Sequence, residues 1–581
     1  SCRISLARTH RSKCVTIRLV LVTPTTSKWF VLPCRRGESP VSIDGRNSEE
    51  DMVKQTRDQP TLVKFLADQA NRLGGRTALL MAEEEGYRGW SYTQLWSEAG
   101  RVAAMLQRRG LRKGDRALLW GPNSPQWVLT FFGCIRAGVV VVPLDLRSGN
   151  DFVQRVADKT RPKLAFVSDS APDRPNTLDV PEIALERLED ELIEGASPDF
   201  VDVTGEDLVE IMFTSGTTGT PKGVMLTHTN LVSNLRAIRQ CIPGRIDDRL
   251  VSILPLSHMY EQMAGLLVPL GAGANVTYQA NLQPAALFKT LQDRRATMLL
   301  LVPQALDLFM SGIEHEVRRQ GREKVWSKMM TVSARLPFWA RRILFGQIHR
   351  RLGGRLRFIM SGGAALDPAL GEKWERLGVR IVQGYGATEA SPVISSHSTA
   401  NPRFDSAGIP LSNMEVRIAS DGEIQVRGPN VTQGYWDDSA QTEAAFDDGW
   451  YKTGDQGHLD RDGYLHIKGR TKDMISMPNG FNVYPDDIET VLKRHPDVCD
   501  VVVVGLPRGS RVDVHAVYLG IDEETAAKAD KWANSQLADY QRIRGSSVWP
   551  SEDFPRTHTL KIKKTLVIEA LAERAEGALS F

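Results

Sequence analysis

Apolar residues over most of the chain follow two alternating patterns, the spacing of helices and short continuous runs. Helical spacing covers 62–73, which Thr61 can cap, and returns at 95–106, which Gly110 can end, and at 125–137. Short aliphatic runs predict buried strands at 117–120, 139–142, 251–255, 298–302 and 356–360. Helices that alternate with such strands predict an α/β architecture.

The pattern changes after Gly422, where the predicted elements become shorter. Strands at 423–427 and 464–468 lie beside two Asp-Gly pairs, Asp421-Gly422 and Asp462-Gly463, which are typical of hairpin turns. A small α+β segment follows, with a helix at 485–493, strands at 501–504 and 514–519, and a last helix at 566–574.

We place a domain boundary at Lys472. A large N-terminal domain of α/β subdomains plus β-structure then covers 56–471, and a small α+β C-terminal domain covers 472–581. The first 37 residues hold eight Arg or Lys and no Asp or Glu, the composition of an organelle transit peptide. We favour the alternative, an extended or wrongly assigned start, because Met52 stands just before the first helix, and we expect no fixed structure over 1–55.

Bulk composition narrows the class of protein. A formal net charge of +3 in 581 residues gives no reason to expect a nucleic-acid partner. Six scattered cysteines without a Cys-x-x-Cys pair favour a reducing compartment, so we expect a cytoplasmic protein. No run of 18 uncharged apolar residues predicts a membrane-spanning helix. No feature indicates an obligate protein partner.

The most informative segment follows the apolar run at 208–213. It reads Phe213-Thr-Ser-Gly-Thr-Thr-Gly-Thr-Pro-Lys-Gly-Val-Met-Leu-Thr-His228, a loop of glycines and hydroxylated residues with one lysine. Glycine lets backbone N–H groups approach a large anion, and Ser and Thr hydroxyls add donors. It is not the common nucleotide P-loop, which needs Gly-Lys-Ser/Thr, because Pro221 precedes the lysine and Gly223 follows it. The segment predicts a polyphosphate site.

This loop resembles the phosphate loop of the adenylate-forming superfamily, which comprises acyl-CoA synthetases, luciferases and peptide-synthetase adenylation domains. Six further motifs stand in that family's order, so that the resemblance covers residues 60–565. They are Leu254-Pro-Leu-Ser-His258, Ser361-Gly-Gly-Ala-Ala365, Gln383-Gly-Tyr-Gly-Ala-Thr-Glu389, Tyr451-Lys-Thr-Gly-Asp455, Gly469-Arg-Thr-Lys-Asp473 and Pro555-Arg-Thr-His-Thr-Leu-Lys561. The resemblance implies an enzyme that activates a carboxylic acid with ATP, and a mobile C-terminal domain that swings about Lys472.

Activation of an acid by ATP needs held phosphates, neutralised charge and an aligned nucleophile. The residues that we expect to hold the β- and γ-phosphates are Thr214, Ser215, Gly216, Thr217, Thr218, Gly219 and Lys222. The resemblance implies that Glu389, helped by Thr214, binds Mg²⁺, an ion that prefers oxygen ligands and keeps several waters. It also assigns Thr388 and Glu389 to catalysis.

Tyr385 lies between two glycines, where its ring can stack on a base or merely pack beside the turn. Stacking does not select adenine, so we expect backbone polar groups to do so, at Gly362, Gly363, Gln383 and Gly384. Asp455 can accept hydrogen bonds from both ribose hydroxyls, as the family aspartate does. The resemblance places Arg470 and Lys472 beside the nucleotide as well.

Two further catalytic residues are implied by the resemblance. His258 is expected to orient the acyl group, and Lys561 to draw the α-phosphate and the carboxylate together in the transition state. Leu560 stands where the family has glycine, which restricts the backbone beside Lys561. After the swing, Gly480 would face the thiol of coenzyme A.

Residues 314–357 hold twelve Arg or Lys against three Glu, interleaved with aromatic and aliphatic residues. The pattern predicts a basic amphipathic helix, for which we weigh two interpretations. It can contact an anionic membrane peripherally, or it can cover the core and expose a solvated basic face.

We expect ATP-dependent ligation of a medium- or long-chain fatty acid to coenzyme A, with release of AMP and pyrophosphate. The alternatives are a ligase that loads the acyl group onto a carrier protein, a CoA ligase for aromatic or short acids, and an inactive nucleotide- or lipid-binding homologue. No acidic residue suits an amino group, which disfavours amino-acid activation. Every charged group that the mechanism needs is present, at Lys222, Glu389, Asp455 and Lys561.

Overall fold

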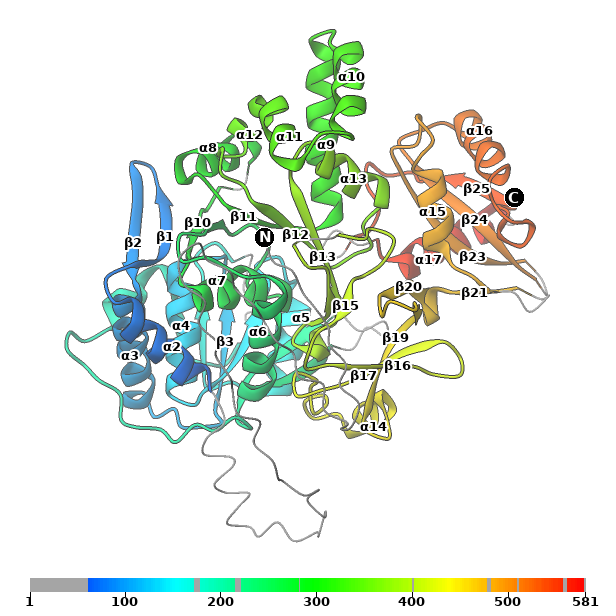
Figure 1. The fold of residues 1–581 in the computed structure, drawn as a ribbon. Coiled ribbons are helices and arrows are strands. Elements are labelled where there is room, and N and C mark those ends of the chain that lie inside the picture. The colour runs from blue at the N-terminus through cyan, green and yellow to red at the C-terminus, as the bar shows by residue number, and fades with distance from the viewer. Residues whose placement is uncertain are drawn as a thin grey trace, which may run out of the picture. The chain divides into compact units, whose positions relative to one another are not determined.

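The computed structural model describes residues 61–171, 178–214, 221–281, 283–399, 402–477, 482–508, 511–556 and 562–578. The expected leader over 1–55 lies outside the described residues, as do Ser215–Thr220 of the phosphate loop, Gly480, Leu560 and Lys561. Within the described residues the chain is an α/β structure with five sheets (Figure 1).

A six-stranded sheet has the order β6-β5-β3-β4-β7-β8 and is parallel except for the last hairpin. Its strands are β3 (Arg116–Trp120), β4 (Val140–Leu144), β5 (Leu164–Val167), β6 (Glu182–Ala184), β7 (Leu208–Thr214) and β8 (Lys222–Thr227). The helices of this part of the chain are α2 (Leu62–Leu73), α3 (Tyr92–Arg108), α4 (Pro125–Arg136), α5 (Asn150–Thr160), η1 (Leu185–Glu191) and α6 (His228–Cys241). Ser124 caps α4, since its hydroxyl accepts a hydrogen bond from Trp127 N, and Pro125 suits the first turn.

A nine-stranded sheet has the order β15-β14-β13-β12-β11-β9-β10-β1-β2. Its strands are β1 (Thr77–Glu83), β2 (Gly86–Ser91), β9 (Arg249–Val251), β10 (Asn275–Tyr278), β11 (Met298–Leu301), β12 (Phe358–Ser361), β13 (Arg380–Gly386), β14 (Val393–Ser396) and β15 (Ile409–Pro410). Its helices are η2 (Glu261–Leu267), α7 (Val268–Ala272), α8 (Pro284–Arg294), α9 (Pro303–Arg319), α10 (Glu323–Ser333), α11 (Phe338–Leu344), α12 (Gly346–Arg351), α13 (Pro368–Arg376) and η3 (Thr388–Ala390).

The strand predicted at 251–255 is wrong, because β9 ends at Val251. Ser252 N still donates to Thr277 O of β10 at 2.9 Å, but Leu254 and Leu256 are hydrogen-bonded to a side chain. Asn123 Nδ2 donates to Leu254 O at 2.6 Å, and Asn123 Oδ1 accepts from Leu256 N at 2.7 Å. An apolar pattern cannot reveal an amide side chain that takes over backbone pairing.

The predicted hairpins after Gly422 are confirmed in a five-stranded antiparallel sheet. Asp421-Gly422 joins β16 to β17, and Asp462-Gly463 joins β19 to β20. The elements are β16 (Glu415–Ile418), β17 (Glu423–Arg427), α14 (Ser439–Ala445), β18 (Phe446–Asp447), β19 (Trp450–Leu459) and β20 (Leu465–Arg470).

The described residues after Arg470 form a small α+β structure. Its elements are η4 (Thr471–Asp473), β21 (Ile475–Ser476), β22 (Asn482–Val483), α15 (Pro485–Leu492), β23 (Asp500–Arg508), β24 (Arg511–Leu519), α16 (Glu523–Asn534), η5 (Asp539–Gln541), β25 (Gly545–Val548) and α17 (Lys564–Ala578). β25 pairs parallel to β24. Its Gly-Ser-Ser-Val sequence has no strand pattern, which explains why the prediction missed it.

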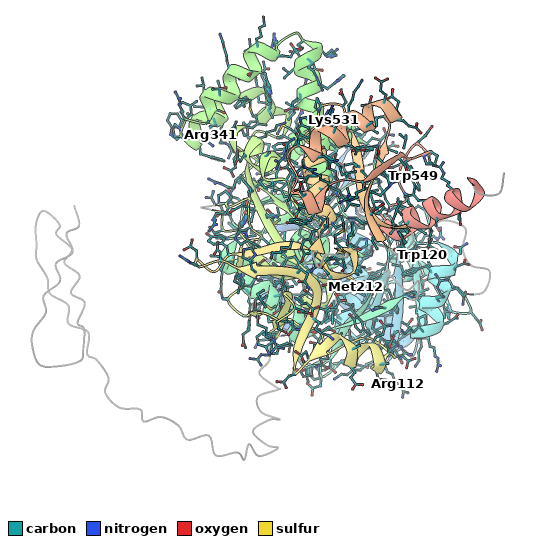
Figure 2. All side chains as sticks on the ribbon, turned by 90° about the vertical axis from the view of Figure 1, so that its right-hand side faces the viewer. Arg112, Trp120, Met212, Arg341, Lys531 and Trp549 are labelled. Atoms are coloured by element: carbon teal, nitrogen blue, oxygen red, sulfur yellow. The ribbon has the colours of Figure 1, made fainter. Side chains whose placement is uncertain are left out.

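The core is built from aliphatic and aromatic side chains of both large sheets. Trp120 and Met212, labelled in Figure 2, are 1% and 2% exposed, whereas Arg112 and Lys531 lie at the surface. Trp120 also has a positioning role, because its indole N–H donates to Asp145 O at 3.0 Å and fixes the turn after β4.

The single amphipathic helix predicted within 314–357 is wrong. The segment is divided among α9, α10, α11 and α12, which are drawn in green in Figure 1. Gly321, with φ of +63°, follows α9, and Pro337 directly precedes α11. A left-handed glycine and a proline both interrupt helical hydrogen bonding.

The large apolar residues of these four helices divide between core and surface. Trp326 and Phe345 pack edge to face with ring centroids 5.6 Å apart, on the core side. Trp339 and Ile343 are 67% and 72% exposed. None of the described helices combines the length and apolar character needed to cross a bilayer.

Candidate active site

The phosphate loop leaves the six-stranded sheet at the β7–β8 hairpin. Thr214, the last residue of β7, pairs in register with Lys222, the first residue of β8. A Cβ on Gly223 would lie 2.8 Å from the Ile211 side chain, so only glycine fits there without rearrangement. The hairpin therefore sets Thr214 and Lys222 side by side at the two ends of the loop.

Lys222 and Glu389 both lie beside Tyr435. The Lys222 ammonium is 5.5 Å from the centre of the Tyr435 ring, and the Tyr435 hydroxyl donates to Glu389 Oε1 at 2.9 Å. Burial, followed by the negative charge of Glu389, raises the pKa of Tyr435. The backbone of Glu389 is held as well, because Thr432 N donates to Glu389 O at 2.7 Å. Tyr435 thus contacts both Lys222, which we predicted to bind phosphate, and Glu389, which we predicted to bind the metal ion.

A second group of side chains joins β13 to the β19–β20 hairpin. The Tyr385 hydroxyl donates to Asp455 Oδ2 at 2.6 Å, and Arg470 Nε lies 3.2 Å from Asp455 Oδ1. Asp455 and Arg470 face each other in the register of the hairpin. Burial lowers the pKa of Arg470, but the charges of Asp455 and, more weakly, Glu389 raise it above its ordinary value. Tyr385, Asp455 and Arg470 thus form one connected group.

The glycines predicted to face the base border β12 and β13. Gly362 follows β12, and a Cβ there would come within 2.9 Å of the Tyr260 ring. Gly363 has φ of +83°, a backbone conformation that favours glycine. Gln383 is buried and pairs with Ser361, and Gly384 pairs with Ser396. These residues form adjoining strand ends on one sheet.

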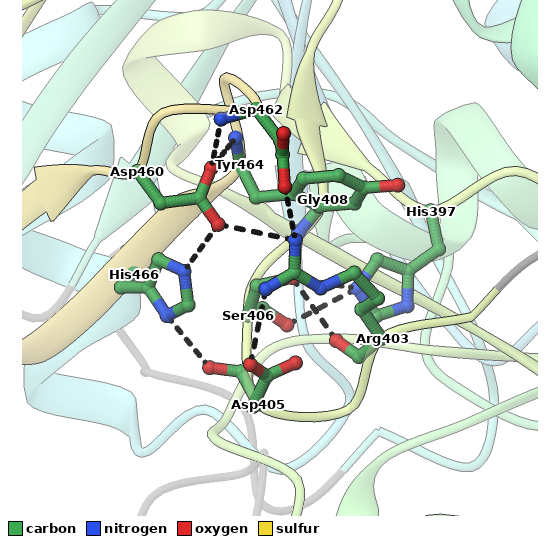
Figure 3. Close-up of polar contacts among 9 residues, drawn as sticks. All are labelled: His397, Arg403, Asp405, Ser406, Gly408, Asp460, Asp462, Tyr464 and His466. Atoms are coloured by element: carbon green, nitrogen blue, oxygen red, sulfur yellow. Dashed lines mark hydrogen bonds and ion pairs between the residues drawn. The ribbon is translucent and has the colours of Figure 1, made fainter.

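An ion-pair network anchors the hairpin that carries Asp455 and Arg470 (Figure 3). Arg403 reaches Asp460 at 3.1 Å and Asp405 at 3.2 Å. His466 bridges the same two residues, with Nε2 3.1 Å from Asp460 Oδ2 and Nδ1 2.8 Å from Asp405 O. The loop before β15 is thereby clamped to the tip of β19 and β20.

His258 is held by a carboxylate that the sequence did not single out. Its Nε2 lies 3.2 Å from Asp145 Oδ2, and Asp145 directly follows β4. Burial raises the pKa of Asp145, but hydrogen bonds from His258 and Arg147 outweigh it and hold that pKa well below its usual range. Asp145 is therefore an ionised acceptor that fixes the orientation of the imidazole.

The structure thus brings together Thr214 with Lys222, Glu389 with Lys222 through Tyr435, and Asp455 with Tyr385 and Arg470. Thr388 begins the short helix η3, and Lys472 lies in η4, two residues beyond Arg470. Sequence reasoning missed Asp145 and Tyr435. A polar residue at the end of a buried strand was the available signal for Asp145, while Tyr435 carried none.

A carboxylate and a hydroxyl suit Mg²⁺, which proteins bind through one or two carboxylates together with substrate phosphates and waters. Glu389 and Thr214 therefore fit a magnesium ion that arrives with its nucleotide.

The AMP-binding enzyme family matches residues 66–436, and the chain belongs to this family. It is 30% identical to feruloyl-CoA synthase from Amycolatopsis sp over 507 residues, which cover 83% of this chain and 94% of that protein. It is 29% identical to long-chain-fatty-acid–CoA ligase FadD15 from Mycobacterium bovis, over 82% of this chain and 90% of that protein.

A solved structure of o-succinylbenzoate CoA synthetase from Bacillus subtilis, in complex with the acyl-adenylate intermediate, superimposes with a TM-score of 0.73. The match has 25% sequence identity and covers 87% of this chain and 97% of that one. Together, the family, the fold and these relatives define the protein as an adenylate-forming acid–CoA ligase.

Proposed function

We propose that this ligase activates a medium- or long-chain fatty acid with ATP and transfers the acyl group to coenzyme A. In the first step a carboxylate oxygen attacks the α-phosphorus of ATP, and the bond to pyrophosphate breaks. In the second step the thiol sulfur attacks the acyl carbon, the bond to AMP breaks and the thiol proton is lost. The products are acyl-CoA, AMP and pyrophosphate.

The observations that carry this proposal are the contacts of Asp455 with Tyr385 and Arg470, and those of Tyr435 with Glu389 and Lys222. Asp455 offers two acceptor oxygens to the ribose, and Tyr385, which binds Asp455, lies beside the base. Lys222 and the phosphate loop stabilise the negative charge of the departing pyrophosphate. Mg²⁺, when bound by Glu389 and Thr214, neutralises phosphate charge.

His258 and Lys561 act on the acid in this proposal. His258, oriented by Asp145, sets the carboxylate in line with the α-phosphorus. Lys561 supplies a cation between the two anions as they approach. Gly480 would face the thiol of coenzyme A in the second step, after the C-terminal domain has turned about Lys472.

Two relatives bear on the chemical nature of the acid. Support for a fatty acid comes from likeness to a long-chain-fatty-acid–CoA ligase. A second candidate is an aromatic acid, because an equally similar relative is a feruloyl-CoA synthase. The Tyr260 ring, packed where a Cβ on Gly362 would lie, also suits a flat substrate.

The test is a product analysis with purified protein, ATP, Mg²⁺ and one acid at a time, with and without coenzyme A. With palmitate, we expect a mass corresponding to palmitoyl-CoA, and acyl-AMP when the thiol is omitted. Ferulate serves as the matched alternative acid. Acyl-AMP without thioester in the presence of coenzyme A would point to a carrier-protein acceptor, and thioester from ferulate alone would replace the fatty acid by an aromatic one.

Peripheral membrane contact remains a prediction. Its support is the exposed pair Trp339 and Ile343 on α11, next to Arg341 and Arg342. Cosedimentation with vesicles of anionic lipid should bind the protein, and Trp339→Ala should weaken binding. Equal recovery with neutral vesicles, or no effect of the substitution, would leave α11 as an ordinary surface helix.

A further inference from the structure

The segment after His258 enters a π-helix, η2, all of whose residues are buried. Short π-helical turns are rare and are frequent at functional sites. The first two residues of η2, Glu261 and Gln262, are polar, and neither has exposed surface. The chemistry derived above assigns no task to either.

These two neighbouring side chains attach η2 to the two large sheets. Gln262 Nε2 donates to Glu210 Oε2 on β7, in the six-stranded sheet, at 3.0 Å. Glu261 Oε1 lies 2.5 Å from Ser252 Oγ, the residue that follows β9 in the nine-stranded sheet. Asn123 extends this second connection, because its Nδ2 donates to Ser252 Oγ at 2.9 Å.

The carboxyl of Glu261 lies against its own helix in a space that glycine leaves free. A Cβ on Gly265 would stand 2.4 Å from Glu261 Oε1 and 2.5 Å from the carboxyl carbon. Any other residue at this position would push the carboxyl away from Ser252. Gly265, four residues after Glu261, therefore leaves the space that the Glu261 carboxyl occupies.

The surroundings of Glu261 favour its neutral form. Among the described residues it forms no ion pair, and the titratable side chains that interact with it are Tyr260 and Tyr278. Burial raises the pKa of Glu261 to about 8, against hydrogen bonds from Ser252 and from the backbone of Leu254 and Ile253. An ionised carboxylate without a cation would cost several kcal/mol in such a place.

The start of η2 borders the site where we expect the acid to bind. Gln262 N donates to His258 O at 3.1 Å, which links the helix directly to the proposed orienting histidine. Tyr260, immediately before Glu261, fills the space beside Gly362. A displacement at Glu261 would therefore move both residues that face the acid.

We propose that Glu261 is a positioning residue of the acid site, where its protonated carboxyl holds the start of η2 against the end of β9 and so sets Tyr260 beside Gly362 and His258 beside Asp145. This inference rests on the proposed function of the same site. It predicts that ionisation of Glu261 disturbs the binding of the acid more than that of the nucleotide, because the proposed phosphate and ribose residues lie on other elements.

The test compares Glu261→Gln with Glu261→Ala by pyrophosphate release, with palmitate as the acid and separate titrations of acid and ATP. At pH 7 we expect the alanine variant to raise the KM for the acid by tenfold or more, since misplacement of about 1 Å can cost on the order of 100-fold. The KM for ATP should change little. Glutamine, neutral and of the same shape, should restore the KM for the acid, and Glu372→Gln on α13 controls for surface charge.

The pH profile separates positioning from a merely structural role. In the unmodified protein the KM for the acid should rise about tenfold between pH 7 and pH 9 as Glu261 loses its proton, whereas Glu261→Gln should lack this rise. Equal alkaline profiles, or a glutamine variant as impaired as the alanine variant at pH 7, would overturn the inference.

A second readout does not depend on activity. Because the folded-state pKa of Glu261 is raised, the unmodified protein should lose thermal stability relative to Glu261→Gln as the pH rises from 5 to 8. If no acid is turned over, the proposed function fails while this shift still tests the neutral carboxyl. The same dependence of melting temperature on pH in the two proteins would refute a neutral Glu261 carboxyl.

Discussion

The substitution Asp455→Asn tests the proposed nucleotide site most sharply. Asp455 is 6% exposed, accepts from the Tyr385 hydroxyl at 2.6 Å and pairs with Arg470 at 3.2 Å. Asparagine keeps the shape but removes the charge and turns one acceptor oxygen into a donor. The ribose hydroxyls then lose one of their two acceptors.

The magnitude follows from that lost hydrogen bond. A hydrogen bond to a charged group contributes about 1.5–3 kcal/mol, which corresponds to a roughly 10- to 100-fold weaker Kd for ATP. We discount the ion pair with Arg470, whose side chain is 46% exposed, because solvent screens such pairs.

The assay is titration calorimetry of ATP binding without acid, together with a melting curve. Asp405→Asn is the matched control. Asp405 is an exposed carboxylate in the ion-pair network of Figure 3, which anchors the hairpin that carries Asp455. We expect the control to keep the Kd of the unmodified protein. If Asp455→Asn also changes the Kd less than about threefold while melting unchanged, Asp455 does not contact the nucleotide.

Three further outcomes are expected. Glu210→Gln should remove a pH-dependent loss of stability, because burial raises the pKa of Glu210 to about 8 from its ordinary 4.5. The free energy of unfolding should fall by about 5 kcal/mol as the pH rises between these two values. Melting curves of the variant, recorded over this pH range, should lack that fall. Asp145→Asn should raise the KM for the acid about tenfold without changing the Kd for ATP, since it frees the imidazole of His258; unchanged acid kinetics would contradict the orienting role. Lys561→Ala should abolish adenylation and leave ATP binding intact, as measured by pyrophosphate exchange and calorimetry; normal exchange would remove Lys561 from the transition state.

Much of the fold followed from local patterns. The Asp-Gly turns predicted the β16–β17 and β19–β20 hairpins because short hairpin turns need a residue that tolerates positive φ, and Gly422 and Gly463 supply it. The helices α2 and α4, which are capped by Thr61 and Ser124, were also predicted to within one residue.

The failures came from interactions between distant residues. Asn123 holds the backbone after β9 from a position more than 120 residues away in sequence, and Tyr435 meets Glu389 across 46 residues. No local periodicity reports such contacts. The prediction of one helix within 314–357 was wrong for a different reason. The apolar residues fit one amphipathic helix only if Gly321 and Pro337, which interrupt it, are ignored.

The site was predictable as a set of residues but not as an arrangement. Motifs singled out Tyr385, Asp455 and Glu389, yet the direct contact of Tyr385 with Asp455 became visible only in the fold. Glu261 shows the limit most clearly. Its neighbours Ser252 and Gly265 carry no recognisable motif, and only their packing reveals a buried, neutral carboxyl.

The most direct test of the central claim, activation of an acid through its adenylate, is phosphorus NMR of one turnover of ATP with palmitate and coenzyme A. The account predicts AMP and pyrophosphate in equal amounts, both dependent on the acid. ADP with inorganic phosphate, or nucleotide breakdown at the same rate without acid, would contradict it.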